Sequence, residues 1–207
     1  MLAIICVIAS ALCGILRVAG MPYIFSAFTS FFAACCALFC KPNGVNILLA
    51  LGLMCSVVAD WFLAHQTGHS ERFIYGIIGF FIAHCLFTLR CMTRFKFSTF
   101  SLVIALVLIV LYSLYMLFRV IDHVPENTKV PVILYTLISI TSLYFAMSAD
   151  VPILPRVFCI LGTALILFSD TMIAENTFCG NHSVEKLILP TYYACHVCLA
   201  LSAVFRF

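Results

Sequence analysis

The chain has 207 residues, of which 65% are hydrophobic and only 9% are charged, and its mean hydropathy is +1.19. Soluble domains carry about 25% charged and about 45–50% apolar residues, so this composition excludes an ordinary soluble domain and indicates an all-α polytopic membrane protein. The net charge of +3 is small and spread along the chain, which argues against a nucleic-acid partner.

Eight apolar segments are long enough to cross a bilayer as helices, which takes about 20 residues each. In chain order they are residues 2–19, 21–39, 46–66, 71–92, 97–119, 130–148, 154–175 and 187–206. We expect a single transmembrane domain over residues 1–207. The first segment is expected to be a retained span rather than a signal peptide, because no basic residue precedes its apolar run.

Eight spans would place both termini on one side of the membrane. That side would carry six Lys and Arg residues against five on the other, and this small excess predicts cytoplasmic termini. Arg90 lies near the end of the fourth apolar segment, and Arg94 and Lys96 follow that segment closely. We expect them to form a basic cluster at the membrane edge.

Two halves of the chain repeat a pattern at a spacing of 110 residues. The pairs at this spacing are Asp60 and Asp170, Ala64 and Ala174, and Pro42 and Pro152. Each acid opens an Asp-x-x-x-Ala motif. The spacing predicts two parallel four-helix repeats, about 1–96 and 97–207, related by an axis along the membrane normal. The two acids are then expected at matching depth, facing each other between the halves.

Asp60 and Asp170 are the leading candidates for catalytic groups. A carboxylate inside a membrane costs about 2.5–3.5 kcal/mol on insertion scales, so such residues are functional by default, although pairing with a neutral donor would hold helices together equally well. Two neighbouring carboxyl groups can share one proton, which places a general acid beside a carboxylate that stabilises positive charge.

Histidines form a second set of candidates. His84 and His196 lie in the middle of apolar segments and are 112 residues apart. A buried histidine is commonly a hydrogen-bonded contact between helices, but the matched spacing to the two acids makes both of them candidate substrate-binding residues. One residue rises about 1.5 Å along a helix, so His84 would lie well away from Asp60 along the axis.

Three further positions could bind a substrate. Lys41 follows the second apolar segment, where it could either extend its charge to the membrane surface or bind a phosphate. Tyr135, Ser139 and Ser142 recur at i, i+4 and i+7. Such a stripe of hydroxyls either forms hydrogen bonds between helices or lines a polar cavity. Tyr192 and Tyr193 open the last segment, and one of them is expected to point inward.

No metal and no cofactor is expected. Most of the twelve cysteines lie in apolar segments, where a thiol behaves as a small hydrophobic group. The sequence Cys195-His196-Val197-Cys198 lacks a second cluster to complete a four-ligand metal site. The motifs of serine hydrolases, zinc proteases and nucleotide-binding proteins are absent.

Several motifs together resemble those of the YhhN-like lysoplasmalogenases, a family of small eight-span membrane proteins. They are the apolar helix ending at Asp60, "FIYGIIGFFIAHCLF", "GTALILFSDTMIA" and "LPTYYACHVCLALS". The resemblance implies hydrolysis of the vinyl ether of lysoplasmalogen to a fatty aldehyde and glycerophosphoethanolamine or glycerophosphocholine. It also implies that Asp60 and Asp170 are the functional acids and that Lys41, His84 and Tyr193 line the site. His196 departs from the family pattern, in which a neutral amide is usual.

Two other function classes compete with this one. A small-solute or proton-coupled transporter would also use parallel repeats and midplane carboxylates. An intramembrane aspartyl protease would need Tyr-Asp and Gly-x-Gly-Asp contexts, which are absent around both acids. The expected partners are a lysophospholipid substrate and membrane lipids, and the oligomeric state is left open, with a dimer as one option.

Overall fold

The computed structural model describes residues 1–40, 44–67 and 70–207. Its eight α-helices, in chain order, are α1 (Leu2–Val18), α2 (Ile24–Phe39), α3 (Gly44–Ala64), α4 (Ser70–Met92), α5 (Thr99–Tyr115), α6 (Glu126–Met147), α7 (Ile153–Cys179) and α8 (Glu185–Val204). A π-helical turn, Met116–Val120, continues α5. The all-α architecture predicted from the sequence is confirmed.

Six of these helices are long and apolar enough to cross a membrane, whereas α1 and α2 are apolar but shorter. The predicted segments agree with the helices to within a few residues, except where α6 begins earlier and α7 ends later. Helix α7 ends at Cys179, whereas the predicted segment ended at Glu175. Glu175 therefore lies one turn inside the helix, and it joins Asp60 and Asp170 as an acid that lies at least one turn inside an apolar helix.

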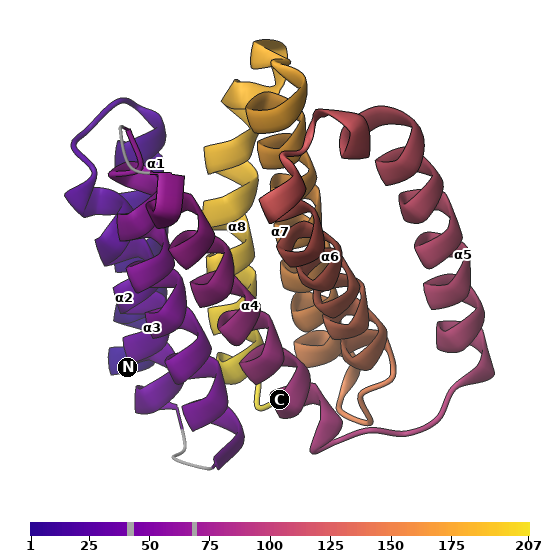
Figure 1. Ribbon diagram of the computed structural model, residues 1–207. Helices are drawn as coiled ribbons and strands as arrows, with labels where there is room; N and C mark the ends of the chain where they lie inside the picture. The colour runs from indigo at the N-terminus through magenta and orange to yellow at the C-terminus, as the bar shows by residue number, and fades with distance from the viewer. Residues whose placement is uncertain (41–43, 68–69) are drawn as a thin grey trace.

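The helices form a bundle in which α4 and α8 occupy the middle (Figure 1). On one side α1, α2 and α3 pack together and against α8, and on the other side α6 packs against α4 and α7. The hairpins α3–α4 and α7–α8 are the most extensively packed pairs. Helix α2 thus contacts α8 while α6 contacts α4. This cross-packing suits the proposed two-half repeat, which stays a prediction.

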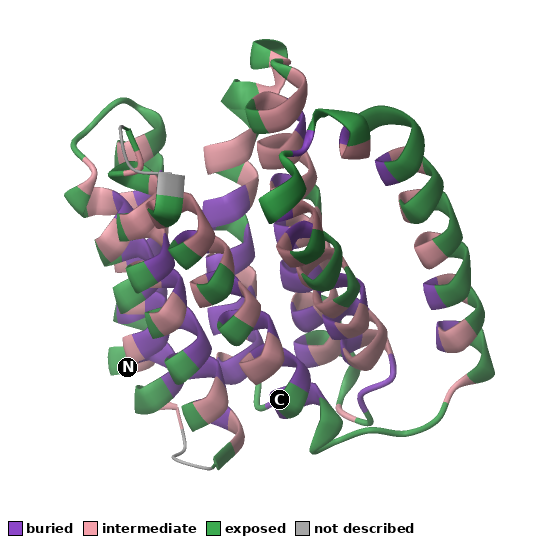
Figure 2. Ribbon diagram, viewed as in Figure 1, coloured by how far each residue is buried: buried purple, intermediate pink, exposed green. Residues whose placement is uncertain are grey.

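Burial follows the helix faces. Buried residues lie on the inward faces of the central helices, while the outward faces are exposed (Figure 2). Those exposed faces are rich in large apolar side chains, including Ile15, Phe31, Leu51, Ile78 and Phe168. Large apolar surfaces exposed all around a bundle are what a lipid-facing protein presents.

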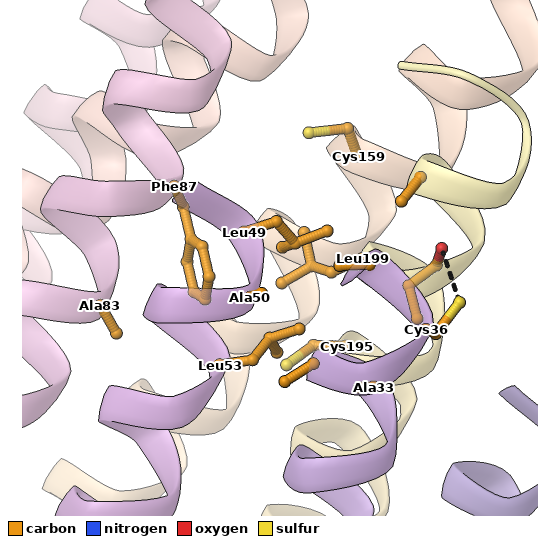
Figure 3. Packing of buried hydrophobic residues seen from close by; sticks show 14 of the residues in the cluster. Ala33, Cys36, Leu49, Ala50, Leu53, Ala83, Phe87, Cys159, Cys195 and Leu199 are labelled. Atoms are coloured by element: carbon orange, nitrogen blue, oxygen red, sulfur yellow. Dashed lines mark hydrogen bonds between the residues drawn. The ribbon is translucent and has the colours of Figure 1, made fainter. Parts of the chain in front are cut away.

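The core is built from small and medium side chains. Figure 3 shows Leu49 and Leu53 of α3 and Leu199 of α8 meeting between the helices. Small residues let the helix backbones approach closely, as in other membrane bundles. A Cβ added at Gly79 of α4 would lie 2.9 Å from the Cβ of Ala59, the residue before Asp60. Close packing of α4 on α3 therefore fixes the backbone that carries Asp60.

Helix α5 lies at one edge of the bundle and packs mainly on α6 (Figure 1). Its end is held by Glu175 of α7, whose Oε1 accepts hydrogen bonds from the Tyr115 hydroxyl at 2.8 Å and from Arg119 Nε at 3.2 Å. Asn181 donates to the other carboxylate oxygen at 3.1 Å. These three donors satisfy the buried carboxylate of Glu175 and give it a structural role.

The prediction that Arg90 belongs to a basic cluster at the membrane edge is wrong. Its side chain is 1% exposed, while Arg94 and Lys96 are exposed. Arg90 lies on the same face of α4 as Phe87, one turn away, and that face is buried. Its Nη1 donates to Ser202 Oγ at 2.9 Å, and its guanidinium lies 4.0 Å from the centre of the Phe207 ring, within range of a cation–π interaction.

Candidate functional site

Asp60 lies one turn before the end of α3. Its Oδ2 accepts a hydrogen bond from the Tyr192 hydroxyl of α8 at 2.9 Å, and a second, longer one from the Ser26 hydroxyl of α2 at 3.5 Å. Three helices therefore converge on one carboxyl oxygen. Oδ1 of Asp60 is bonded to none of the described residues, which leaves this oxygen for another molecule.

A pocket of about 360 Å³ surrounds Asp60, and nine of its fifteen lining residues are polar. It is placed at the end of the bundle where α1, α3 and α7 end and where α2 and α8 begin. Besides Asp60, Ser26 and Tyr192, its polar lining consists of Arg17, Tyr23, Gln66, Asn176, Glu185 and Tyr193. We call it the polar pocket. Charged and amide side chains at its mouth suit a hydrated, charged ligand.

Asp170 lies within α7 at the centre of a hydrogen-bonded group. Its Oδ2 accepts from the Tyr135 hydroxyl of α6 at 2.6 Å and lies 3.6 Å from His84 Nε2 of α4. His84 is fully buried, and its Nε2 is also 3.1 Å from the Tyr135 hydroxyl. With its proton on Nε2, His84 can donate to Tyr135, which in turn donates to Asp170. The three side chains therefore form one connected chain of hydrogen bonds.

The stripe of hydroxyls on α6 serves this group. Ser142 Oγ donates to the His84 carbonyl oxygen at 3.1 Å and lies 3.4 Å from His84 Nδ1. Ser139 Oγ lies 3.4 Å from His84 Nε2. The stripe therefore forms hydrogen bonds between helices, as one interpretation predicts. Tyr135 and Ser139 also line a cavity, but that cavity is mostly apolar rather than polar.

A second pocket surrounds Asp170 and is almost entirely apolar. Its volume is about 70 Å³. Apart from Tyr112, Tyr135, Thr136, Ser139 and Asp170, its lining consists of apolar side chains from α3 to α7, among them Phe73, Ile77, Met116, Val132, Leu167 and Phe178. We call it the apolar pocket. Such a lining suits hydrocarbon, and a volume of about 70 Å³ has room for the first few carbons of a chain.

The two pockets are neighbours. Leu63, Phe80 and Ile173 line both of them, so these three side chains form the wall between the two acids. Phe80 is the most buried of the three and packs edge-on against the Tyr192 ring at 5.9 Å. Each acid therefore has its own pocket and its own tyrosine, and a proton shared directly between the two carboxyl groups, as the sequence suggested, has no support in this geometry.

The candidate residues fall into three groups. Tyr135 and His84 contact Asp170, although the spacing had matched His84 to Asp60. Tyr193 lines the polar pocket, but the neighbouring Tyr192 makes the bond to Asp60. His196 contacts neither acid, because its Nδ1 donates to the Tyr192 carbonyl oxygen one turn back on α8, at 2.9 Å.

Lys41 lies outside the described residues, so its predicted role stays a prediction. The described part of α2 ends at Phe39, whereas Ser26, near the start of the same helix, lines the polar pocket. The residues that the sequence reading missed are Arg17, Tyr23 and Ser26. The repeat offered a signal for Ser26. Pro22 and Pro131 stand near the start of the second and sixth apolar segments. Four residues after each proline, Ser26 and Tyr135 bond to Asp60 and Asp170 respectively.

Comparison with known proteins gives one match. The model of the YhhN family matches residues 21–203, which include every described residue of both pockets except Arg17. No curated protein and no solved structure matches the chain. A family match over most of the chain, on an all-helical membrane architecture with two carboxyl-centred pockets, settles the relationship: the chain belongs to the YhhN family.

Proposed function

We propose that this protein is a lysoplasmalogenase, a hydrolase that cleaves the vinyl ether of a lysoplasmalogen within the membrane. The YhhN family includes lysoplasmalogenases. The observation that carries the proposal is the pairing of two pockets of opposite polarity, each with its own aspartate and with a shared wall. A lysoplasmalogen is itself polar at one end and apolar at the other, with the reactive bond between them.

The order of atoms in such a substrate assigns the two acids different roles. From the head group outward, the atoms run glycerol oxygen, α-carbon, β-carbon and hydrocarbon chain. With the head group in the polar pocket and the chain in the apolar pocket, the β-carbon lies on the side of Asp170 and the α-carbon on the side of Asp60. Asp170 is then the proton donor, and Asp60 stabilises the cation and activates water.

The reaction is an acid-catalysed addition of water. Asp170 transfers its proton to the β-carbon, and the π electrons of the double bond form the new C–H bond. The α-carbon and the ether oxygen then share the positive charge of an oxocarbenium ion, which the Asp60 carboxylate stabilises. Water adds to the α-carbon and gives a proton to Asp60. The resulting hemiacetal loses its hydroxyl proton to water and breaks its bond to the glycerol oxygen, which takes the proton from Asp60, and the aldehyde is released.

Tyr135 and His84 complete the cycle on the side of Asp170. Both contact Oδ2 of Asp170. Oδ1 is bonded to none of the described residues, so this oxygen can carry the proton that is transferred. After transfer, the Asp170 carboxylate is stabilised by the hydrogen bond from Tyr135. Reprotonation through His84 and Tyr135 delivers a proton to Oδ2, and rotation of the carboxyl group then returns that proton to the position from which it is transferred.

The proposal is tested by incubating purified protein with a lysoplasmalogen and, separately, with the lysophospholipid that carries an ester at the same position. We expect mass spectrometry to detect a fatty aldehyde from the vinyl ether and no fatty acid from the ester. Release of fatty acid would make the protein a lysophospholipase. Uptake of solute into vesicles without any product would favour the transporter class instead.

A further inference from the structure

We propose that Arg17 and Tyr23, at the mouth of the polar pocket, form the binding site for the phosphate of the substrate head group, with Glu185 facing its ammonium group. This inference rests on the proposed function and adds a residue-level site to it. It also moves the expected phosphate contact from Lys41 to the opposite end of α2.

Arg17 is a half-buried cation near the end of α1. Its Nη1 donates to the Met21 carbonyl oxygen at 3.0 Å, which holds the guanidinium over the loop between α1 and α2. Its Nε is buried and has no hydrogen-bond partner among the described residues, and none of the described ion pairs involves Arg17. A buried donor normally has a partner, so this one is consistent with a ligand acceptor.

Tyr23, the residue before α2, supplies a second donor to the same pocket. Its hydroxyl is likewise buried and without a partner among the described residues. Burial raises the pKa of this hydroxyl, and the charge of Asp60 adds to the effect, so the group keeps its proton at neutral pH and can donate. Edge-on packing against His65, with ring centres 5.7 Å apart, fixes the ring.

A guanidinium and a phenol pointing into one cavity match the needs of a phosphate. Arginine binds phosphate oxygens through charge-assisted hydrogen bonds and cannot lose its proton in a protein. Glu185 is exposed at the start of α8 and lines the same pocket, which gives it an anion for a cationic ammonium. A cavity of about 360 Å³ is within the usual size range of small-ligand sites.

The arrangement fixes the direction in which the substrate binds. Phosphate held at the polar pocket leaves the glycerol oxygen pointing toward Asp60 and directs the chain toward the apolar pocket, which it enters by displacing the Leu63 and Phe80 side chains of the shared wall. The same contact lets the protein bind lysoplasmalogen in preference to alkenyl lipids that carry no phosphate. Binding energy from the phosphate then serves to place the vinyl ether between the two acids.

The test compares Arg17→Gln, Arg17→Lys and wild type on two substrates in phospholipid-free micelles: a lysoplasmalogen and the 1-alkenylglycerol that lacks the phosphate and amine. We expect Arg17→Gln to lower kcat/KM for lysoplasmalogen about 10- to 100-fold, mainly through KM, as the loss of a charge-assisted hydrogen bond predicts. Arg17→Lys should recover part of this loss. The rate with alkenylglycerol should change less than about threefold, as expected for a contact the substrate lacks.

Control measurements separate the possible failures. Arg94→Gln removes an exposed cation outside both pockets and should leave both rates unchanged. Glycerophosphoethanolamine should inhibit wild type more strongly than Arg17→Gln, while inorganic phosphate tests whether the anion alone suffices. Glu185→Gln should weaken inhibition by glycerophosphoethanolamine but not by glycerol phosphate.

Equal losses on both substrates would overturn the phosphate assignment and make Arg17 a structural residue. An unchanged KM for lysoplasmalogen in Arg17→Gln would overturn it as well, and a large loss in Lys41→Gln would return the phosphate to Lys41. A wild-type protein that releases no aldehyde from either substrate would contradict the proposed function itself, which is a different outcome from all of these.

Discussion

The polar pocket and the apolar pocket share one feature, an aspartate bonded to a tyrosine hydroxyl, but differ in the other groups around that aspartate. In each, a tyrosine hydroxyl from a neighbouring helix donates to Oδ2 of the aspartate, at 2.9 Å from Tyr192 to Asp60 and at 2.6 Å from Tyr135 to Asp170. Among the described residues a histidine contacts Asp170 but not Asp60, and the pocket around Asp60 has the more polar lining. Two similar carboxyl groups therefore acquire different chemistry from their surroundings.

The helices around the two pockets also pack to different extents. Helix α1 packs on both α2 and α8 beside Asp60, whereas α5 packs chiefly on α6 beside Asp170. The apolar pocket is thus bounded by the helix at the edge of the bundle, next to the lipid. A substrate chain that enters from the bilayer meets the less closely packed side first, which suits the proposed order of head group and chain.

Replacing either acid is expected to have the largest effect on activity. Asp60→Asn and Asp170→Asn each keep the shape of the side chain and remove the acid–base function. We expect each to lower kcat about 10²- to 10⁴-fold, the usual contribution of a general acid or base. The double variant should be little worse than either single one, because the two groups act in one reaction.

Aldehyde release from purified, monodisperse protein measures these effects. Asp150→Asn is the matched control, since Asp150 is exposed and pairs with Lys96 at 3.6 Å outside the pockets. If either pocket variant kept the wild-type rate, its aspartate would have no catalytic role.

Removing the tyrosine hydroxyls sharpens the comparison. Tyr135→Phe and Tyr192→Phe each delete one hydrogen bond to a carboxyl group, and we expect kcat to fall about 10- to 100-fold, because bonds to charged groups contribute about 1.5–3 kcal/mol. The larger loss should occur in Tyr135→Phe, which also cuts the path from His84. Tyr75→Phe, at an exposed residue, serves as the control. Equal, small losses in all three variants would mean that the hydroxyls of Tyr135 and Tyr192 do not influence the reactivity of the two carboxyl groups.

The two histidines, which the sequence treats alike, should behave differently. His84→Gln removes the group 3.6 Å from Asp170, and we expect a loss of about tenfold in kcat, at the low end for proton transfer to a catalytic acid. His196→Gln restores the amide that is usual in the family and removes a bond to the helix backbone and an edge-on contact with the Tyr192 ring, whose centre lies 4.4 Å away. Its rate should stay within about threefold of wild type, as expected for a residue outside the site. A reversed order would transfer the proton path to His196.

The smallest expected effect is on packing beside Asp60. Gly79→Ala brings a Cβ to 2.9 Å from that of Ala59, and we expect destabilisation of about 1–3 kcal/mol, typical of overpacking, with a lower Tm in detergent. Gly44→Ala is the control, because nothing lies within 4 Å of the added atom. An unchanged Tm in Gly79→Ala would mean that α4 can shift without cost and does not fix the backbone of Asp60.

The fold was largely predictable because the bilayer restricts it. Long apolar runs with short connections leave little choice but helices, and the helix positions followed from where the polar residues interrupt those runs. Arg90 escaped prediction for a specific reason. It stands near the end of its helix, where a cation is usually at the membrane surface, and only the packing of α4, α7 and α8 reveals that its face is buried.

The site was predictable only in part. Asp60 and Asp170 stand out because a carboxyl group in an apolar run is rare, but no pattern along the chain tells which residue of another helix meets it. The pairing of His84 with Asp170 depends on α4 packing against α6, a contact between distant segments. Arg17 and Tyr23 were missed because each lies near a helix end, where charged and aromatic residues are ordinary.

The central claim is that the protein protonates the β-carbon of a vinyl ether, and one measurement tests it directly. Purified protein is incubated with lysoplasmalogen in ²H₂O, and the aldehyde is trapped and analysed by mass spectrometry. Acid-catalysed hydrolysis predicts one deuterium on the carbon next to the aldehyde carbon, with no label in the Asp170→Asn sample beyond the uncatalysed background. Aldehyde released without that deuterium would contradict the mechanism, because its β-carbon would not have been protonated from water.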